Sequence, residues 1–178
     1  MTTNKNRIFL IGFMGTGKTT IGQILAKNIG MEWLDLDCLI EQQVGETISD
    51  IFTSRGERWF RNKETEILEK VSRKPNIVLS TGGGVVLNPN NIELMKKKGM
   101  VVALTAEVNT LWERLKGNSN RPLLQGKNPK NALVQLYIER ETFYNKGHFS
   151  IQVDNRSPEN IAEDIIEKFH LFKSTHLC

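Results

Sequence analysis

The sequence predicts an α/β fold in which helices cover both faces of a parallel sheet. Short apolar runs alternate with segments of helical periodicity along the whole chain, and this alternation is typical of parallel sheets. A glycine-rich segment, GFMGTGKTT, also stands directly between the first apolar run and the first helical pattern. The 178 residues contain no internal repeat and no linker, so we expect one domain, 1–178.

Each predicted element follows from its hydrophobic pattern. Apolar runs predict strands at 7–12 (RIFLIG), 32–36 (EWLDL), 76–80 (NIVLS), 100–105 (MVVALT) and 149–153 (FSIQV). Helical patterns cover about 18–28, 38–44, 49–72, 88–99, 107–116, 131–144 and 158–172. An interruption of the third helix is expected near Arg55 and Gly56.

The segment GNSNRPLLQGKNPKN (117–131) breaks this alternation because it is polar and rich in Gly, Asn and Pro. Arg121 stands near its middle. A flexible segment with such an arginine suits a lid that closes over phosphates. A solvated charged loop is the alternative.

Composition and charge alone do not identify the kind of ligand that the protein binds. A net charge of +4 fits an anionic ligand, nucleic acid or plain solubility. Basic residues are spread out, with no block longer than Lys96–Lys98, so no nucleic-acid partner is expected. Cys38 and Cys178 make neither a disulfide framework nor a metal spacing. The N-terminal apolar run is too short to span a membrane, and a cytoplasmic location is expected.

The segment Gly12–Thr19, here called the phosphate loop, matches the pattern G-x-x-x-x-G-K-[S/T] between a predicted strand and a predicted helix. Glycines let successive backbone N–H groups face phosphate oxygens, and the helix N-terminus adds a favourable potential. Lys18 would reach the β and γ phosphates, and the Thr19 hydroxyl would bind Mg²⁺. The alternative is a glycine turn without a ligand. The context favours a site for a nucleoside triphosphate.

Two carboxylates, Asp35 and Asp37, stand at the end of the predicted second strand. Side chains two apart along a strand share a face, and ligands lie at the carboxyl ends of parallel strands. One carboxylate would lie near Mg²⁺, and the other would accept a proton from an attacking hydroxyl. Alternatively, Asp37 only caps a helix that begins at Cys38.

The predicted helix 49–72 carries Arg58, Arg61 and Glu64 at intervals of three, which makes an Arg61–Glu64 pair feasible. The planar fork of arginine can bind a carboxylate through two parallel hydrogen bonds. A solvated ion pair on the helix surface is the other interpretation. The periodicity alone leaves both open.

Three consecutive glycines, Gly82–Gly84, follow the predicted third strand and are here called the glycine turn. If that strand lies beside the one before the phosphate loop, their backbone N–H groups face the cleft where a phosphoryl acceptor must lie. Glycine permits close approach there, because any Cβ would take up the acceptor's space. A strained turn without a ligand is the alternative.

Taken together, the sequence from about Arg7 to Phe172 resembles the shikimate kinase family. The motifs GFMGTGKTT, LDLDCLIE, FRNKE, STGGGVV, NRPLL and ERETFY carry the resemblance, in the family's order and spacing. The phosphate loop is shared by many families, but the other motifs together are specific to this one. The resemblance implies a three-layer P-loop kinase fold with a five-stranded parallel sheet, an acceptor-binding region at about 38–72 and a mobile lid at about 115–130.

The resemblance also implies an activity and its residues. The activity is ATP-dependent phosphorylation of the 3-hydroxyl of shikimate, giving shikimate 3-phosphate and ADP on the way to chorismate and the aromatic amino acids. A monomer with Mg²⁺ is expected. Asp37, Lys18 and Arg121 match the catalytic positions. The shikimate positions are Asp37, Arg61, Gly82, Gly83, Gly84 and Arg140. The ATP positions are Gly15, Thr16, Gly17, Lys18, Thr19, Thr20, Arg114, Arg121 and Arg156, and the metal positions are Thr19 and Asp35.

Two other functions stay open on the sequence. One is another small-molecule kinase, for gluconate or a nucleoside monophosphate. A monophosphate is already ionised and needs no carboxylate base, so Asp37 argues against that acceptor. The other is a nucleotide-switched binding module, which would hydrolyse ATP slowly whether or not shikimate is present.

Overall fold

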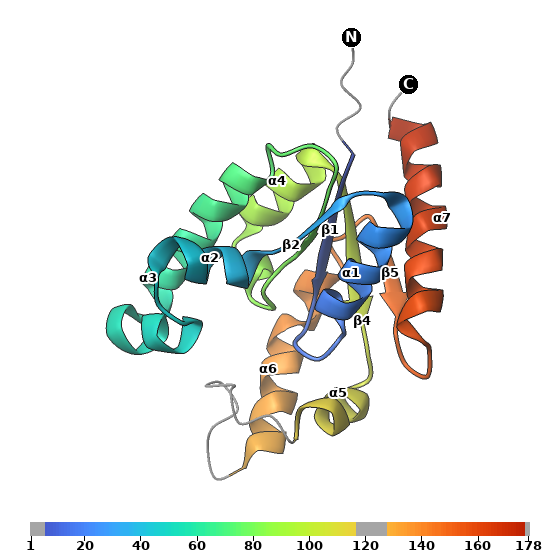
Figure 1. Cartoon of the computed structure of the whole chain (residues 1–178). Helices are drawn as coiled ribbons and strands as arrows, with labels where there is room; N and C mark the ends of the chain where they lie inside the picture. Colours follow the sequence, from blue (N-terminus) through green and yellow to red (C-terminus); the bar gives the residue numbers. More distant parts are fainter. Residues whose placement is uncertain (1–5, 117–127, 177–178) are drawn as a thin grey trace.

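A five-stranded parallel sheet with strand order β2-β3-β1-β4-β5 forms the centre of the protein (Figure 1). The structure is a computed structural model, and it describes residues 6–116 and 128–176. Arg121, Cys178 and most of the predicted lid lie outside the described residues. The strands are β1 (Arg7–Gly12), β2 (Glu32–Asp35), β3 (Ile77–Ser80), β4 (Met100–Thr105) and β5 (Phe149–Gln152). The five predicted strands are confirmed to within one residue at either end.

The predicted helices are also confirmed, with differences at their ends. Helix α2 begins at Leu36, two residues earlier than predicted, and α7 continues past Phe172 to His176. Gly56, with φ 79°, kinks α3 where an interruption was predicted. The helices are α1 (Lys18–Ile29), α2 (Leu36–Val44), α3 (Ile48–Val71), α4 (Pro89–Lys98), α5 (Val108–Leu115), α6 (Pro129–Tyr144) and α7 (Pro158–His176), with a 3₁₀ turn η1 (Val85–Leu87).

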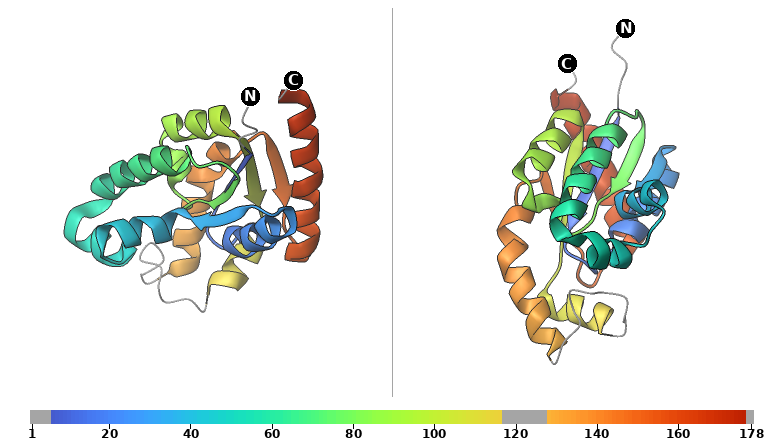
Figure 2. Two further views of the ribbon diagram at one scale, coloured as in Figure 1. Left: turned by 45° about the horizontal axis from the view of Figure 1, so that its top comes forward. Right: turned by 90° about the vertical axis from the view of Figure 1, so that its left-hand side faces the viewer.

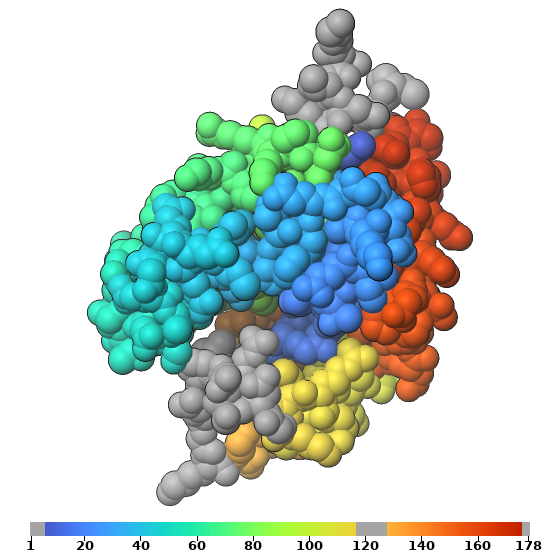
Figure 3. Space-filling view, viewed as in Figure 1, coloured from blue at the N-terminus to red at the C-terminus, as the bar shows by residue number. Residues whose placement is uncertain are grey.

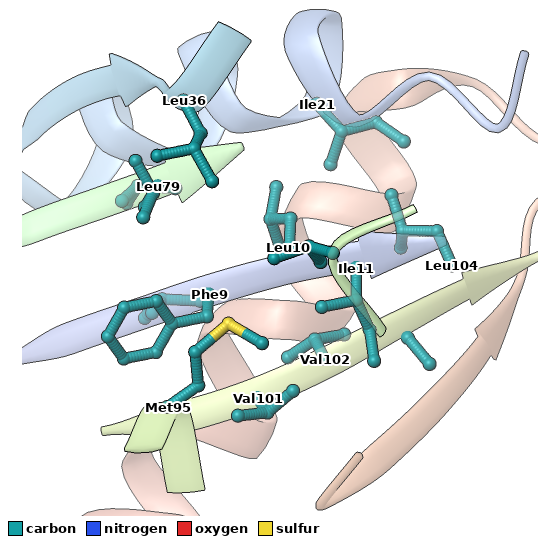
Figure 4. Packing of buried hydrophobic residues seen from close by; sticks show 14 of the residues in the cluster. Phe9, Leu10, Ile11, Ile21, Leu36, Leu79, Met95, Val101, Val102 and Leu104 are labelled. Carbon is teal, nitrogen blue, oxygen red and sulfur yellow. The ribbon is translucent and has the colours of Figure 1, made fainter. Parts of the chain in front are cut away.

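Helices cover both faces of the sheet and make the fold three-layered. Helices α1 and α7 lie on one face, and α4 and α6 lie on the other (Figure 2). Every residue of β1 is buried, and so is every residue of β4 except Thr105. In Figure 4, Leu10 lies on the side of Ile21, and Phe9 lies on the side of Met95. Strands buried on both faces need apolar residues at successive positions, which explains their continuous hydrophobic runs. No helix in the described residues is long and apolar enough to cross a membrane.

The two glycine segments follow neighbouring strands. Strand β1 leads into the phosphate loop and α1, whereas its neighbour β3 leads into the glycine turn and α4. Because α1 and α4 lie on opposite faces, the chain diverges here, and ligands of such sheets bind in the crevice at this point. Figure 3 shows a recess on this side of the molecule between α2–α3 (cyan) and the phosphate loop with α1 (blue).

Candidate active site

The phosphate loop has the backbone shape that its glycines permit. Gly15 and Gly17 have φ of 83° and 88°, values that side-chain-bearing residues rarely adopt. The Lys18 amino group folds back over the loop, donating to the carbonyl oxygens of Gly12 at 2.8 Å and Phe13 at 2.9 Å. Its charge therefore lies over the loop where phosphates are expected.

Asp35 joins the phosphate loop to the start of α2. Its Oδ2 accepts a hydrogen bond from Thr19 Oγ1 at 3.3 Å. Its Oδ1 accepts from the backbone N–H groups of Asp37, at 3.0 Å, and Cys38, at 3.3 Å, which makes Asp35 the N-cap of the helix.

The structure contradicts both the predicted strand position of Asp37 and the alternative that Asp37 caps the helix. Strand β2 ends at Asp35, so Asp37 lies in the first turn of α2 and does not share a strand face with Asp35. Asp37 is also not the cap, because Asp35 already accepts the bonds from the N–H groups at the helix start. The side chain of Asp37 lies beside Gly82 of the glycine turn instead.

The Thr19–Asp35 pair fits a magnesium site in its chemistry. A hydroxyl and a carboxylate are hard oxygen donors, which Mg²⁺ prefers. Among the described residues there is no group of three or more His, Cys, Asp or Glu side chains that could hold a metal ion. A magnesium ion here would therefore complete its coordination with phosphate oxygens and water.

Two carboxylates fill the open side of the first glycine of the turn. A Cβ on Gly82 would lie 2.8 Å from Asp37 Oδ1 and 3.0 Å from Glu64 Oε1. Asp37 thus reaches the turn from α2, and Glu64 reaches it from α3. A methyl group at this position would force carboxylate side chains of the protein itself to move.

The other two glycines of the turn have different surroundings. A Cβ on Gly84 would overlap the guanidinium of Arg61. A Cβ on Gly83 would make only ordinary contacts, the nearest at 3.5 Å to the backbone nitrogen of Met14 in the phosphate loop. Of the three glycines of the turn, Gly83 is therefore the one at which a methyl group would fit. The space at Gly82 and Gly84, which the sequence interpretation gave to the acceptor, is used by protein side chains.

Arg61 is held by two glutamates of its own helix. Its Nε and Nη2 donate to Glu57 Oε1 at 3.2 and 3.1 Å, and its Nη1 donates to Glu64 Oε2 at 2.9 Å. Burial alone would lower the Arg61 pKa, but the two glutamates outweigh burial and raise it. These bonds use three of the five guanidinium N–H groups, which leaves one each on Nη1 and Nη2. Guanidinium N–H groups such as these can donate to a carboxylate.

Glu64, which the sequence indicated only as a possible partner of Arg61, is also a residue of this site. It is 1% exposed, and burial is the main reason that its pKa is raised to about 7, while Arg61 opposes the shift. Its Oε1 is buried and accepts no hydrogen bond from the described residues. A signal for this role exists in the sequence, because Glu64 occupies the apolar stripe of α3 formed by Phe60, Ile67 and Val71.

Arg140 belongs to the same group of charged side chains. It lies on α6, is only 6% exposed, and its charge acts on Glu64 and on the hydroxyl of Tyr144. Buried charged groups need partners, and the carboxylate of Glu64 and the phenol of Tyr144 supply polar surroundings here. The structure thus gathers Asp37, Arg61 and Arg140 around the glycine turn.

The remaining predicted arginines occupy different places. Arg114 Nη1 on α5 donates to the carbonyl oxygen of Gly15 at 3.0 Å, so Arg114 lies against the phosphate loop. Arg156 follows β5 and bonds to α7, with Asp164 Oδ2 at 2.7 Å and the carbonyl oxygen of Asn160 at 3.4 Å. The described contacts therefore bring Arg114, but not Arg156, to the phosphate loop.

Known proteins resemble this chain over nearly its whole length. The sequence model of the family described as shikimate kinase matches residues 14–170. A shikimate kinase of Thermodesulfovibrio yellowstonii is 43% identical over 162 residues, which cover 91% of this chain and 94% of the relative. The structure of the shikimate kinase from Acinetobacter baumannii in complex with shikimate has a TM-score of 0.89 at 37% identity, covering 98% of this chain and 97% of that chain. A gluconokinase from Sinorhizobium meliloti has a TM-score of 0.59 at 14% identity over 96% of this chain and 95% of that chain, a likeness of fold alone.

Proposed function

Because the chain belongs to the shikimate kinase family, we propose that it transfers the γ-phosphoryl group of ATP to the 3-hydroxyl of shikimate. The products are shikimate 3-phosphate and ADP, and the reaction is a step toward chorismate and the aromatic amino acids. As a member of this family the chain is an enzyme, a phosphotransferase whose acceptor is an alcohol group. The shikimate bound to the Acinetobacter baumannii relative supports this acceptor.

The observation that carries the proposal is the convergence of three side chains on the glycine turn. Arg61 and Arg140 bring two positive charges to a largely buried place, which suits the carboxylate of the acceptor. Asp37 Oδ1 is buried beside Gly82, and a carboxylate oxygen there can accept a hydrogen bond from a hydroxyl of the acceptor. Gly83 faces the phosphate loop, so an acceptor beside it is close to the phosphoryl donor.

In the proposed reaction, the backbone of Gly15–Thr20 binds the ATP phosphates and Lys18 compensates the charge on the β and γ groups. Asp37 accepts the proton of the 3-hydroxyl as that oxygen bonds to the γ phosphorus. The bond between the γ phosphorus and its bridging oxygen breaks, and ADP leaves. Arg114 and Arg156 are both proposed to contact the adenine side of the nucleotide.

Thr19 and Asp35 are proposed to hold Mg²⁺, which would neutralise charge on the phosphates when bound. Arg121 is proposed to close over the phosphates as part of a lid at about 115–130, with residues 38–72 as the acceptor-binding region. The cytoplasmic location, the monomeric state and the absence of nucleic-acid and membrane partners stay predictions.

A coupled assay of ADP release tests the proposal. We expect shikimate to stimulate release strongly in the presence of Mg²⁺, and quinate, gluconate and AMP to stimulate it little. EDTA should abolish the stimulation. Release that responds to gluconate or AMP instead would identify a different kinase. Release that is equally slow with and without shikimate would favour the nucleotide-switched module.

A further inference from the structure

The three carbonyl groups of the glycine turn are bonded in two different ways. The Gly82 carbonyl accepts from the backbone of Val85 at 3.2 Å, and the Gly84 carbonyl accepts from that of Leu87 at 3.0 Å. Both bonds are local and belong to the turn itself. The Gly83 carbonyl instead accepts from the hydroxyl of Tyr144 at 2.7 Å, across 61 positions of the sequence. The middle of the turn is thus tied to α6.

This one bond determines the direction of a whole peptide unit. The described residues contain no cis peptide bond, so the carbonyl of Gly83 and the N–H of Gly84 lie in one plane and point in opposite directions. Fixing the carbonyl therefore fixes the N–H as well. A glycine segment has more backbone freedom to lose than any other. A hydrogen bond from another helix to the middle of the turn therefore restricts its conformation strongly.

Tyr144 is itself held on several sides. It is 3% exposed, and its ring meets Phe13 of the phosphate loop edge to face, with centroids 6.4 Å apart and planes at 86°. Arg140 lies one helical turn earlier on α6 and interacts with the phenol through its charge and through hydrogen bonding. Burial is the main cause of a raised Tyr144 pKa, so the hydroxyl keeps its proton and remains a donor near neutral pH.

We propose that Tyr144 is a positioning residue for the phosphoryl acceptor, which aligns the Gly83–Gly84 peptide with Arg140 and the phosphate loop. Three parts that the reaction needs, namely the glycine turn, a carboxylate-binding arginine and the phosphate loop, meet at this one side chain. The inference rests on the proposed function, since it assumes that shikimate binds beside the glycine turn.

Tyr137 provides a matched control for the test. It is the other of the two tyrosines in the chain, it also lies on α6, and its ring also meets Phe13, with centroids 5.4 Å apart. Its hydroxyl hydrogen-bonds to Glu141, whereas that of Tyr144 bonds to the glycine turn. Replacing either tyrosine by phenylalanine removes one hydroxyl and keeps the ring.

The experiment compares Tyr144→Phe, Tyr137→Phe and the unmodified chain by calorimetric titration with shikimate and, separately, with ATP and Mg²⁺. We expect Tyr144→Phe to weaken shikimate binding by about threefold to tenfold, the size of one neutral hydrogen bond. ATP binding should change by less than about twofold, because the phosphate loop keeps its own bonds. Hydrogen exchange in a peptide spanning residues 81–87 should become faster in Tyr144→Phe only.

The outcomes separate the possibilities. Unchanged shikimate affinity in Tyr144→Phe, or an equal loss in Tyr137→Phe, would overturn the positioning role. A parallel loss of shikimate and ATP affinity that follows the fall in thermal stability would also overturn it and leave Tyr144 as a structural residue. If the unmodified chain binds ATP but no shikimate, the proposed function fails, and the inference fails with it.

Discussion

The guanidinium of Arg61 lies so close to Gly84 that a single methyl group on that glycine would overlap it. Gly84 has φ −99° and ψ −1°, angles that other residues adopt without strain. The need for glycine here is therefore a matter of the space that Arg61 occupies. Glycine at this position leaves the guanidinium of Arg61 the place that it occupies.

Gly84→Ala should displace Arg61 and weaken shikimate binding by about tenfold or more, since hydrogen bonds to charged groups contribute roughly 1.5–3 kcal/mol. Gly83→Ala is the control variant, because it places a methyl group at the neighbouring glycine of the same turn. Its methyl group fits the described neighbours, so its melting temperature should stay close to that of the unmodified chain. Titration with shikimate and thermal unfolding of both variants check this. A Gly84→Ala protein with normal shikimate affinity would contradict the packing argument.

Arg61→Lys keeps the charge but removes the planar fork, because lysine cannot bond both glutamates and still offer two parallel donors. We expect shikimate binding to weaken by roughly 1–3 kcal/mol, with ATP binding almost unchanged. Arg58→Lys, on the exposed side of α3, serves as the control. Calorimetric titration with each ligand measures both effects. Unaltered shikimate affinity in Arg61→Lys would remove Arg61 from the acceptor site.

Asp37→Asn preserves the shape of the side chain but cannot take up a proton. General-base assistance contributes about 10²–10⁴-fold, so the rate of phosphoryl transfer should fall by that factor while the circular dichroism spectrum stays unchanged. Single-turnover measurement of shikimate 3-phosphate formation isolates this step. A loss below tenfold that appears only as weaker shikimate binding would mean that Asp37 orients the hydroxyl without acting as a base.

Glu64 makes the stability of the fold depend on pH in an unusual direction. Its folded-state pKa of about 7 lies above the ordinary value of 4.5, so the folded chain binds a proton more tightly than the unfolded chain. The free energy of unfolding should therefore fall as pH rises from about 4.5 to 7, by at most about 1.4 kcal/mol per pH unit from this group. Arg61, Asp37 and Arg140 are the charged groups that face it.

Urea unfolding at about pH 5, 6, 7 and 8 measures the free energy of unfolding as a function of pH. Variants separate the contribution of Glu64 from that of the other carboxyl groups. Glu64→Gln should remove the contribution, so that the difference between the variant and the unmodified chain changes across this window. Glu69→Gln, exposed on the same helix, should keep the slope of the unmodified chain. A constant difference between Glu64→Gln and the unmodified chain from pH 5 to 8 would show that Glu64 is ionised throughout.

The sequence was sufficient for the strands and for most helix ends, because continuous apolar runs and helical periodicity report burial directly. It was insufficient at LDLD. Two aspartates two positions apart can each cap a helix, and only the path of the chain leaving β2 decides that Asp35 does so. Because Asp35 is the cap, Asp37 lies in the first turn of α2 and not at the end of β2.

The sequence also could not show which side chains surround the individual glycines of the turn. The crowding at Gly82 and Gly84 comes from α2 and α3, which are distant in sequence. The tie from Tyr144 to Gly83 has the same origin in tertiary packing. Glu64, in contrast, was within reach, since a charged residue in an apolar helical stripe signals a special environment. The assignment of ligands to these residues stays a prediction.

The two carboxylate oxygens of Asp35 bond to two different parts of the molecule. Asp35 can therefore couple the binding of nucleotide at one part to the binding of shikimate at the other. One oxygen accepts from Thr19 of the phosphate loop, and the other accepts from the first turn of α2, which carries Asp37. If bound nucleotide displaced Asp35, the start of that helix would lose or shift these hydrogen bonds. Linkage of this kind is reciprocal, so the factor by which nucleotide alters the affinity for shikimate is also the factor by which shikimate alters the affinity for nucleotide.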